Sequence, residues 1–145
     1  MNAPLEIRDP SLGILRFDRL AWRGDTRSGV PIFVEAGKDG PDASLRQAAV
    51  TTIQRLPELE SRARAFLERT APPERPWPHL TLVAAEVFRP HADWVRREVA
   101  PSHPAAAQAI LGGAPAVSLE FAIAGERDVV DVVFFENEPV AGEYH

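Results

Sequence analysis

The chain contains no cysteine, and this absence excludes several kinds of chemistry. Disulfides, thiolate zinc sites and cysteine nucleophiles all require a thiol. A chain of 145 residues can bury roughly two thirds of the surface that its unfolded form exposes. It therefore needs neither a disulfide nor a metal to hold a core, and we expect one domain over residues 1–145.

Long apolar runs are also absent. A membrane-spanning helix requires about 18 consecutive apolar residues, and no stretch of the chain approaches this length. The first ten residues, MNAPLEIRDP, have neither the basic nor the apolar region of a signal peptide. We expect no membrane association and a cytoplasmic location.

Lysine occurs once among the sixteen basic residues, at Lys38, and the other fifteen are arginine. This preference indicates the coding bias of a GC-rich bacterial genome. A nucleic-acid partner is not expected, because the net charge is −5 and the basic residues are not clustered. The negative charge is concentrated near the end: residues 120–145 carry a net charge of −6, whereas residues 1–119 sum to +1. This asymmetry favours a basic protein as partner.

The common motifs of nucleotide binding, metalloproteases and α/β-hydrolases are missing, among them G-x-x-x-x-G-K-[ST], G-x-G-x-x-G, H-E-x-x-H and G-x-S-x-G. No two histidines lie three or four residues apart, the spacing that would place both on one face of a helix to bind a metal. These histidines are His79, His91, His103 and His145. We predict no metal site and no cofactor.

The stretch PHADW places His91 two residues before Asp93. On a strand, this spacing would put both side chains on one face, as a base and its orienting carboxylate. A first-turn or capping role for Asp93 is the simpler interpretation, because Pro90 precedes it and a helix is expected to follow. The three tryptophans are expected to seal the margins of the core rather than line a pocket; they are Trp22, Trp77 and Trp94.

Strand character dominates the first part of the chain. We expect Leu15–Trp22 and the β-branched run Val30–Ala36 to form an antiparallel hairpin across the RGDTRSG loop. Apolar residues then recur at helical spacing over Ser44–Arg69, and Pro57 interrupts this stretch. It predicts one kinked helix or two abutting helices.

The middle of the chain is less definite. Leu80–Phe88 is compatible with a strand or a helix, and we favour a strand. Short helices are predicted between Asp93 and Leu111.

The end of the chain carries the clearest strand pattern. Apolar residues alternate with small or polar ones from Val117 to Ile123, and the run VVDVVFFENE returns after the turn GERD. Val130, Val132 and Phe134 are expected on the core face and Asp131 on the other. Pro139 is expected to end the pairing, because it cannot donate to a ladder.

Four carboxylates of this region are the candidate binding residues: Asp131, Glu136, Glu138 and Glu143. Glu136 and Glu138 would share a face if the strand continued, and paired carboxylates can divide acid and base roles. Alternatively, the charges guard a strand edge against aggregation or form a docking surface. No catalytic residue is assigned.

The chain resembles a group of small bacterial α+β domains of unknown function. The resemblance lies in the pattern D-P-x-x-G-x-L-x-[FY], followed by W-x-G, a strand, a helix and an acidic hairpin. Some of these domains look like immunity proteins. The resemblance implies no catalytic residues, covers about two thirds of the chain and departs over Ala71–Gly113, which would be an insertion. The matching positions are Asp9, Pro10, Gly13, Leu15, Phe17, Trp22, Gly24, Glu136 and Glu138.

We therefore predict an α+β fold in which an antiparallel sheet of about four to six strands packs against the Ser44–Arg69 helical stretch, with short extra helices. The expected function is a non-enzymatic protein-binding module, an immunity or accessory protein whose acidic C-terminal surface meets a basic partner. The alternative is a small hydrolase that uses Glu136 or Glu138 with a histidine. A homodimer formed through an open sheet edge is a third prediction.

Overall fold

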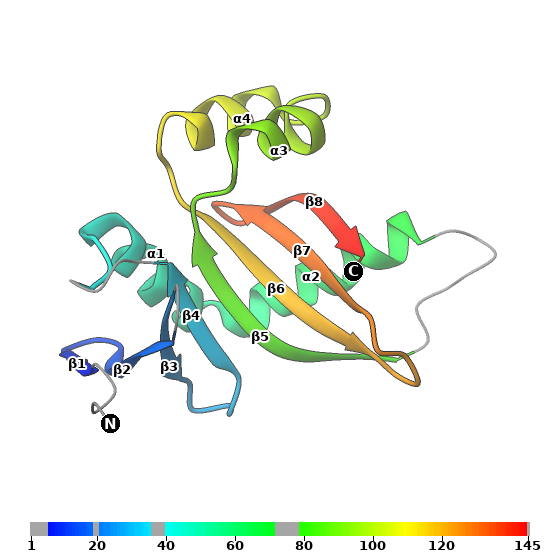
Figure 1. Cartoon of the computed structure of the whole chain (residues 1–145). Coiled ribbons are helices and arrows are strands. Elements are labelled where there is room, and N and C mark those ends of the chain that lie inside the picture. The colour runs from blue at the N-terminus through cyan, green and yellow to red at the C-terminus, as the bar shows by residue number, and fades with distance from the viewer. Residues whose placement is uncertain (1–5, 19–20, 36–39, 72–78, 145) are drawn as a thin grey trace.

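The structure is a computed structural model that describes residues 6–18, 21–35, 40–71 and 79–144 (Figure 1). Its centre is one eight-stranded sheet in which the strands lie in chain order. All neighbouring strands are antiparallel except β4 and β5, which are parallel. The strands are β1 (Glu6–Asp9), β2 (Gly13–Asp18), β3 (Ala21–Asp25), β4 (Pro31–Glu35), β5 (Leu80–Phe88), β6 (Ala116–Ile123), β7 (Val129–Phe135) and β8 (Glu138–Tyr144).

The helices fall into two groups. The first group, α1 (Ala43–Gln54) and α2 (Leu56–Thr70), joins β4 to β5, because parallel neighbours require a crossover connection. The second group joins β5 to β6 and lies beyond one end of the strands in Figure 1. It consists of α3 (Ala92–Trp94), the π-helix η1 (Val95–Val99) and α4 (Pro104–Leu111). No helix of the described residues is long and apolar enough to cross a membrane.

The predicted antiparallel sheet of four to six strands beside one long or kinked helix is wrong. The sheet is mixed and has eight strands. Of the two alternatives predicted for Ser44–Arg69, the structure has the two abutting helices, α1 and α2. One source of extra strands is the stretch Leu15–Trp22, which is divided between β2 and β3; β3, rather than the whole stretch, pairs with β4. Ala36, the expected end of the hairpin, lies outside the described residues.

Two more strands are β1, which pairs with β2 before Leu15–Trp22 begins, and β8, which the expected role of Pro139 excluded. The chain turns after Phe135 and pairs back, with Pro139 opposite Phe134. β8 is an edge strand, where proline is tolerated because one side of the strand has no ladder to complete.

Other predictions are confirmed. Leu80–Phe88 is a strand, and β6 and β7 form the predicted hairpin. Residues expected on its core face, among them Leu119, Phe121 and Val132, are fully buried.

Two apolar clusters lie on opposite faces of the sheet. The larger cluster lies between α1, α2 and the inner face, and includes Trp22, Val34, Leu59 and Phe121. The smaller cluster places η1 and α4 against one end of the outer face, through residues such as Val99 and Val133. The rest of the outer face is not covered by these helices.

A buried carboxylate ties the first strands to α1. Asp9 accepts hydrogen bonds from the backbone N–H groups of Ser11 and Leu12, and its Oδ2 lies 2.6 Å from Arg46 Nε. Burial opposes the charge of Asp9, but these donors and Arg46 outweigh it and hold the pKa of Asp9 below its usual value.

Candidate functional site

Three carboxylates lie side by side on the outer face of β6, β7 and β8. Glu120 is directly opposite Asp131, and Asp131 is directly opposite Glu143. We call these three residues the carboxylate row. Side chains in direct register have Cβ atoms about 4.5–5.5 Å apart, and like charges at this spacing destabilise a sheet.

Strand alternation produces the row. Glu120 lies between Leu119 and Phe121, and Asp131 lies between Val130 and Val132. These four apolar neighbours are buried in the inner cluster. The acidic side chains must therefore point to the outer face.

Glu86 of β5 adds a fourth carboxylate close to the carboxylate row. It pairs with Ser118, two residues before Glu120. Glu86 as a whole is exposed, yet protein atoms crowd its carboxyl group. Burial raises the pKa of Glu86, and the charges of Glu35, Asp131 and Glu120 raise it further.

A cavity of about 400 Å³ lies beside the row, and we call it the acidic pocket. Its lining includes four carboxylates, Glu35, Glu86, Asp131 and Glu143. Trp94, at the junction of α3 and η1, also lines it and donates from Nε1 to Glu143 Oε1 at 3.2 Å. An aromatic ring beside carboxylates suits a guanidinium or ammonium group, because both attract a cation.

Arg89 also lines the acidic pocket, but its guanidinium is bonded elsewhere. Its Nη1 donates to Asp42 Oδ2 at 2.7 Å, its Nη2 to Ser44 Oγ at 2.8 Å and its Nε to the Gly113 carbonyl at 2.9 Å. The hydrogen bond from Arg89 is the main reason that the pKa of Asp42 lies well below its usual value. Arg89 therefore braces α1 against the loop after α4 and is not directed at the carboxylate row.

The structure brings together two of the four predicted binding residues, Asp131 and Glu143. The condition for Glu136 and Glu138 to share a strand face is not met, because β7 ends at Phe135 and Glu136 lies in the turn with φ of 57°. Glu138 Oε1 lies 3.0 Å from Nη1 of Arg62 in α2. The described residues that line the depression beside Glu136 include no histidine, so the arrangement required by the hydrolase hypothesis is not found there.

Sequence reasoning did not select Glu86, Glu120 or Trp94. The alternation in β6 could have selected Glu120, because it predicts an outward position opposite Asp131. Glu86 could not be found, because its place beside β6 depends on the pairing of β5 with β6 across α3, η1 and α4.

The local predictions around the tryptophans have mixed outcomes. Asp93 does lie in the first turn of α3, where it pairs with Arg96 at 3.4 Å, as Pro90 and the expected helix suggested. Trp22 is buried in the core. Half-buried Trp94 packs against the smaller cluster, as expected, but it also lines the acidic pocket. Trp77 lies outside the described residues.

Within the described part of the chain, no three histidine, aspartate or glutamate side chains are grouped closely enough to hold a metal ion. Comparison of the chain with protein-family models, with curated proteins and with solved structures finds no match. The site thus combines four carboxylates and the ring of Trp94 around one cavity.

Proposed function

We propose that this protein is a protein-binding module that docks a basic segment of a partner protein onto its outer sheet face. The observation that carries the proposal is the direct register of Glu120, Asp131 and Glu143. A cationic side chain placed among these groups would be attracted by all three carboxylates. Arginine or lysine of the partner would enter the acidic pocket beside Trp94.

The charge distribution supports the same proposal at longer range. Residues 120–145 carry a net charge of −6, and the carboxylate row belongs to this segment. Such a field chiefly accelerates association and selects partners, and it weakens as salt screens it. An immunity or accessory role in the cytoplasm is compatible with such a module, and the absence of cysteine suits a reducing compartment.

The test compares two double variants that remove the same charge. Glu120→Gln with Asp131→Asn changes the carboxylate row, whereas Glu68→Gln with Asp25→Asn changes two exposed carboxylates outside residues 120–145. The partner is captured on the immobilised wild-type protein from native lysate at low salt and then purified. Its association rate with each protein is measured over a series of salt concentrations.

We expect the wild-type rate to fall steeply with salt, and the row variant to lose about tenfold in rate at low salt. The control pair should stay within about twofold of wild type. A wild-type rate that does not change with salt, or an equal loss in both variants, contradicts the proposal. Circular dichroism checks that each variant is folded.

A further inference from the structure

The first half of β5 has no strand beside it on the side that faces β4. The parallel ladder joins only Ile32–Val34 of β4 to Ala85–Val87 of β5. β5 begins at Leu80, so its residues 80–84 extend beyond the ladder. Among the described residues, no strand pairs with this part of β5 except β6.

The backbone of this segment points into the open side. Leu80 is opposite Ile123 of β6, and the flanking hydrogen bond runs from the Ala124 N–H to the His79 carbonyl. In an antiparallel ladder, this pattern directs the N–H and C=O groups of Leu80 away from β6. Arg64 confirms the direction, because its Nη1 donates to the Leu80 carbonyl at 2.9 Å.

Leu82 lies two residues farther along, opposite Phe121, so its N–H and C=O share the orientation of Leu80. The ladder to β6 shifts directly after Leu82, which makes Leu82 the last residue in this register. An arriving strand would therefore meet the N–H groups of Leu80 and Leu82 and the carbonyl of Leu82.

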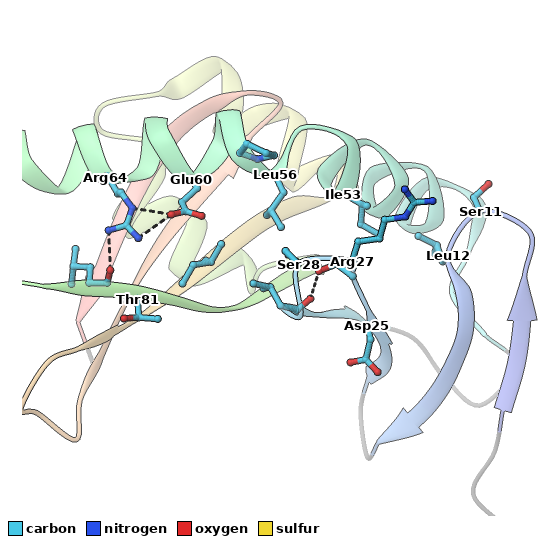
Figure 2. Close-up of a pocket in the computed structure, with 15 residues that line it drawn as sticks. Ser11, Leu12, Asp25, Arg27, Ser28, Ile53, Leu56, Glu60, Arg64 and Thr81 are labelled. Carbon is cyan, nitrogen blue, oxygen red and sulfur yellow. Dashed lines mark hydrogen bonds and ion pairs between the residues drawn. The ribbon is translucent and has the colours of Figure 1, made fainter.

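A cleft of about 730 Å³ lies along this edge (Figure 2). Figure 2 shows Leu56, Glu60 and Arg64 pointing from α2 toward β5, with the β3–β4 loop on the opposite side. The apolar lining includes Leu12, Ile53, Leu56 and Leu82. Its volume lies within the range of about 300–1,000 Å³ for ligand sites.

The two ends of the cleft differ in charge. At one end, Arg64 is held by Glu60 at 2.9 Å and by the Leu80 carbonyl, so its charge is already paired. On the β3–β4 loop, Arg27 is exposed and lies beside Ile53 in Figure 2. Among the described residues, its guanidinium makes no ion pair or hydrogen bond. Arg27 therefore offers a positive charge to an arriving carboxylate.

The β3–β4 loop is a firm wall for the cleft. Thr26 Oγ1 donates to the Val30 carbonyl at 2.7 Å, and the Gly29 N–H donates to the Thr26 carbonyl at 3.0 Å. The partners of these hydrogen bonds all lie within the loop. The loop therefore forms no ladder with Leu80 or Leu82, and the edge of β5 can pair with another chain.

We propose that the cleft binds an extended peptide segment of a partner protein, which adds a short strand to the edge of β5. Main-chain hydrogen bonds to Leu80 and Leu82 would supply affinity. Aliphatic side chains at alternate positions would pack beneath Leu56 and Ile53, and a carboxylate in the segment would pair with Arg27. This peptide differs in charge and location from the basic segment proposed for the outer face, so either proposal can fail alone.

The test uses the peptide acetyl-Thr-Val-Glu-Val-Thr-Val-amide and a copy in which alternate backbone nitrogens are methylated. Binding is followed through the backbone amide resonances and hydrogen exchange of the ¹⁵N-labelled protein. We expect the Leu80 and Leu82 amides to shift and to exchange at least tenfold more slowly with the first peptide. In the methylated copy, the methyl groups are placed on the backbone nitrogens that would face β5. This copy should bind at least tenfold more weakly, because it lacks the N–H donors for the edge of β5.

Arg27→Glu tests the charge at an exposed position, where loss of folding is not expected. This variant should weaken the glutamate peptide about tenfold and should bind better a peptide with lysine in place of glutamate. No binding at millimolar peptide, shifts confined to other residues, or insensitivity to both methylation and charge reversal overturns the proposal. Sedimentation that shows dimers, with the Leu82 amide protected as the dimer forms, assigns the edge to a second copy and also overturns it.

Discussion

Among the single residues, Glu86 has a pKa that is raised by the environment of the outer face. Burial raises its pKa, and three neighbouring carboxylates raise it further. A carboxyl group with a higher pKa in the folded state binds its proton preferentially there. Its contribution to stability is therefore complete below the unfolded-state pKa and is lost as the pH rises through the folded-state pKa.

Glu86→Gln should increase the free energy of unfolding at pH 7, because glutamine cannot acquire the unfavourable charge. The gain should vanish near pH 4, below the ordinary glutamate pKa of 4.5, where both states hold the proton. Urea unfolding at the two pH values measures the difference. Glu68→Gln, on an exposed part of α2, is the control and should change little at either pH. An equal gain for Glu86→Gln at both pH values would show that charge is not the cause.

At the scale of elements, the β7–β8 hairpin depends on an unfavourable turn. Glu136 has φ of 57°, the only positive value at a non-glycine residue in the described chain. Arg62 of α2 holds this turn, because its Nη1 donates to the Asn137 carbonyl at 3.1 Å and to Glu138 at 3.0 Å. The packing of the hairpin thus maintains a backbone conformation that glycine would adopt at lower cost.

Glu136→Gly should raise the free energy of unfolding by about 1 kcal/mol, because it removes the steric cost of the left-handed conformation. Asn137→Gly is the matched control in the same turn. Asn137 does not have positive φ, so glycine there should be neutral or destabilising. Urea denaturation of both variants gives the comparison, and an equal effect of the two substitutions would contradict the explanation.

At the scale of the whole molecule, the described part of Ala71–Gly113 contributes a strand to the central sheet. Its strand β5 lies between β4 and β6 and contributes buried Ala85 and Val87 to the larger cluster. The helices that follow form the smaller cluster on the opposite face of the same strands. Because the two clusters share the sheet, we expect the chain to unfold as one unit.

Leu59→Ala in the larger cluster should lower the free energy of unfolding by about 3 kcal/mol. Val99→Ala in the smaller cluster should lower it by about 2 kcal/mol. In each case, far-ultraviolet and near-ultraviolet circular dichroism should give coincident unfolding curves in urea. A separate early transition in Val99→Ala would show that η1 and α4 form an independent unit.

Sequence reasoning succeeded where a short pattern is sufficient. The alternation in Val117–Ile123 predicted strand and face, and the helical spacing after Ser44 predicted α1 and α2. It failed at Pro139, because the rule against proline in strands depends on whether the strand is at an edge. It also failed to join Glu86 to the C-terminal carboxylates, since their proximity depends on the pairing of β5 with β6 across α3, η1 and α4, and no local pattern records it.

The sequence by itself determined which residues face the core, the absence of thiol chemistry and the acidity of the C-terminal segment. These properties depend on residue type and on spacing along the chain. Only the tertiary structure decided which carboxylates become neighbours, because strand register converts distant positions such as Glu120, Asp131 and Glu143 into one row. It also decided that β5 extends beyond β4, because the length of a ladder depends on both strands and on the crossover between them.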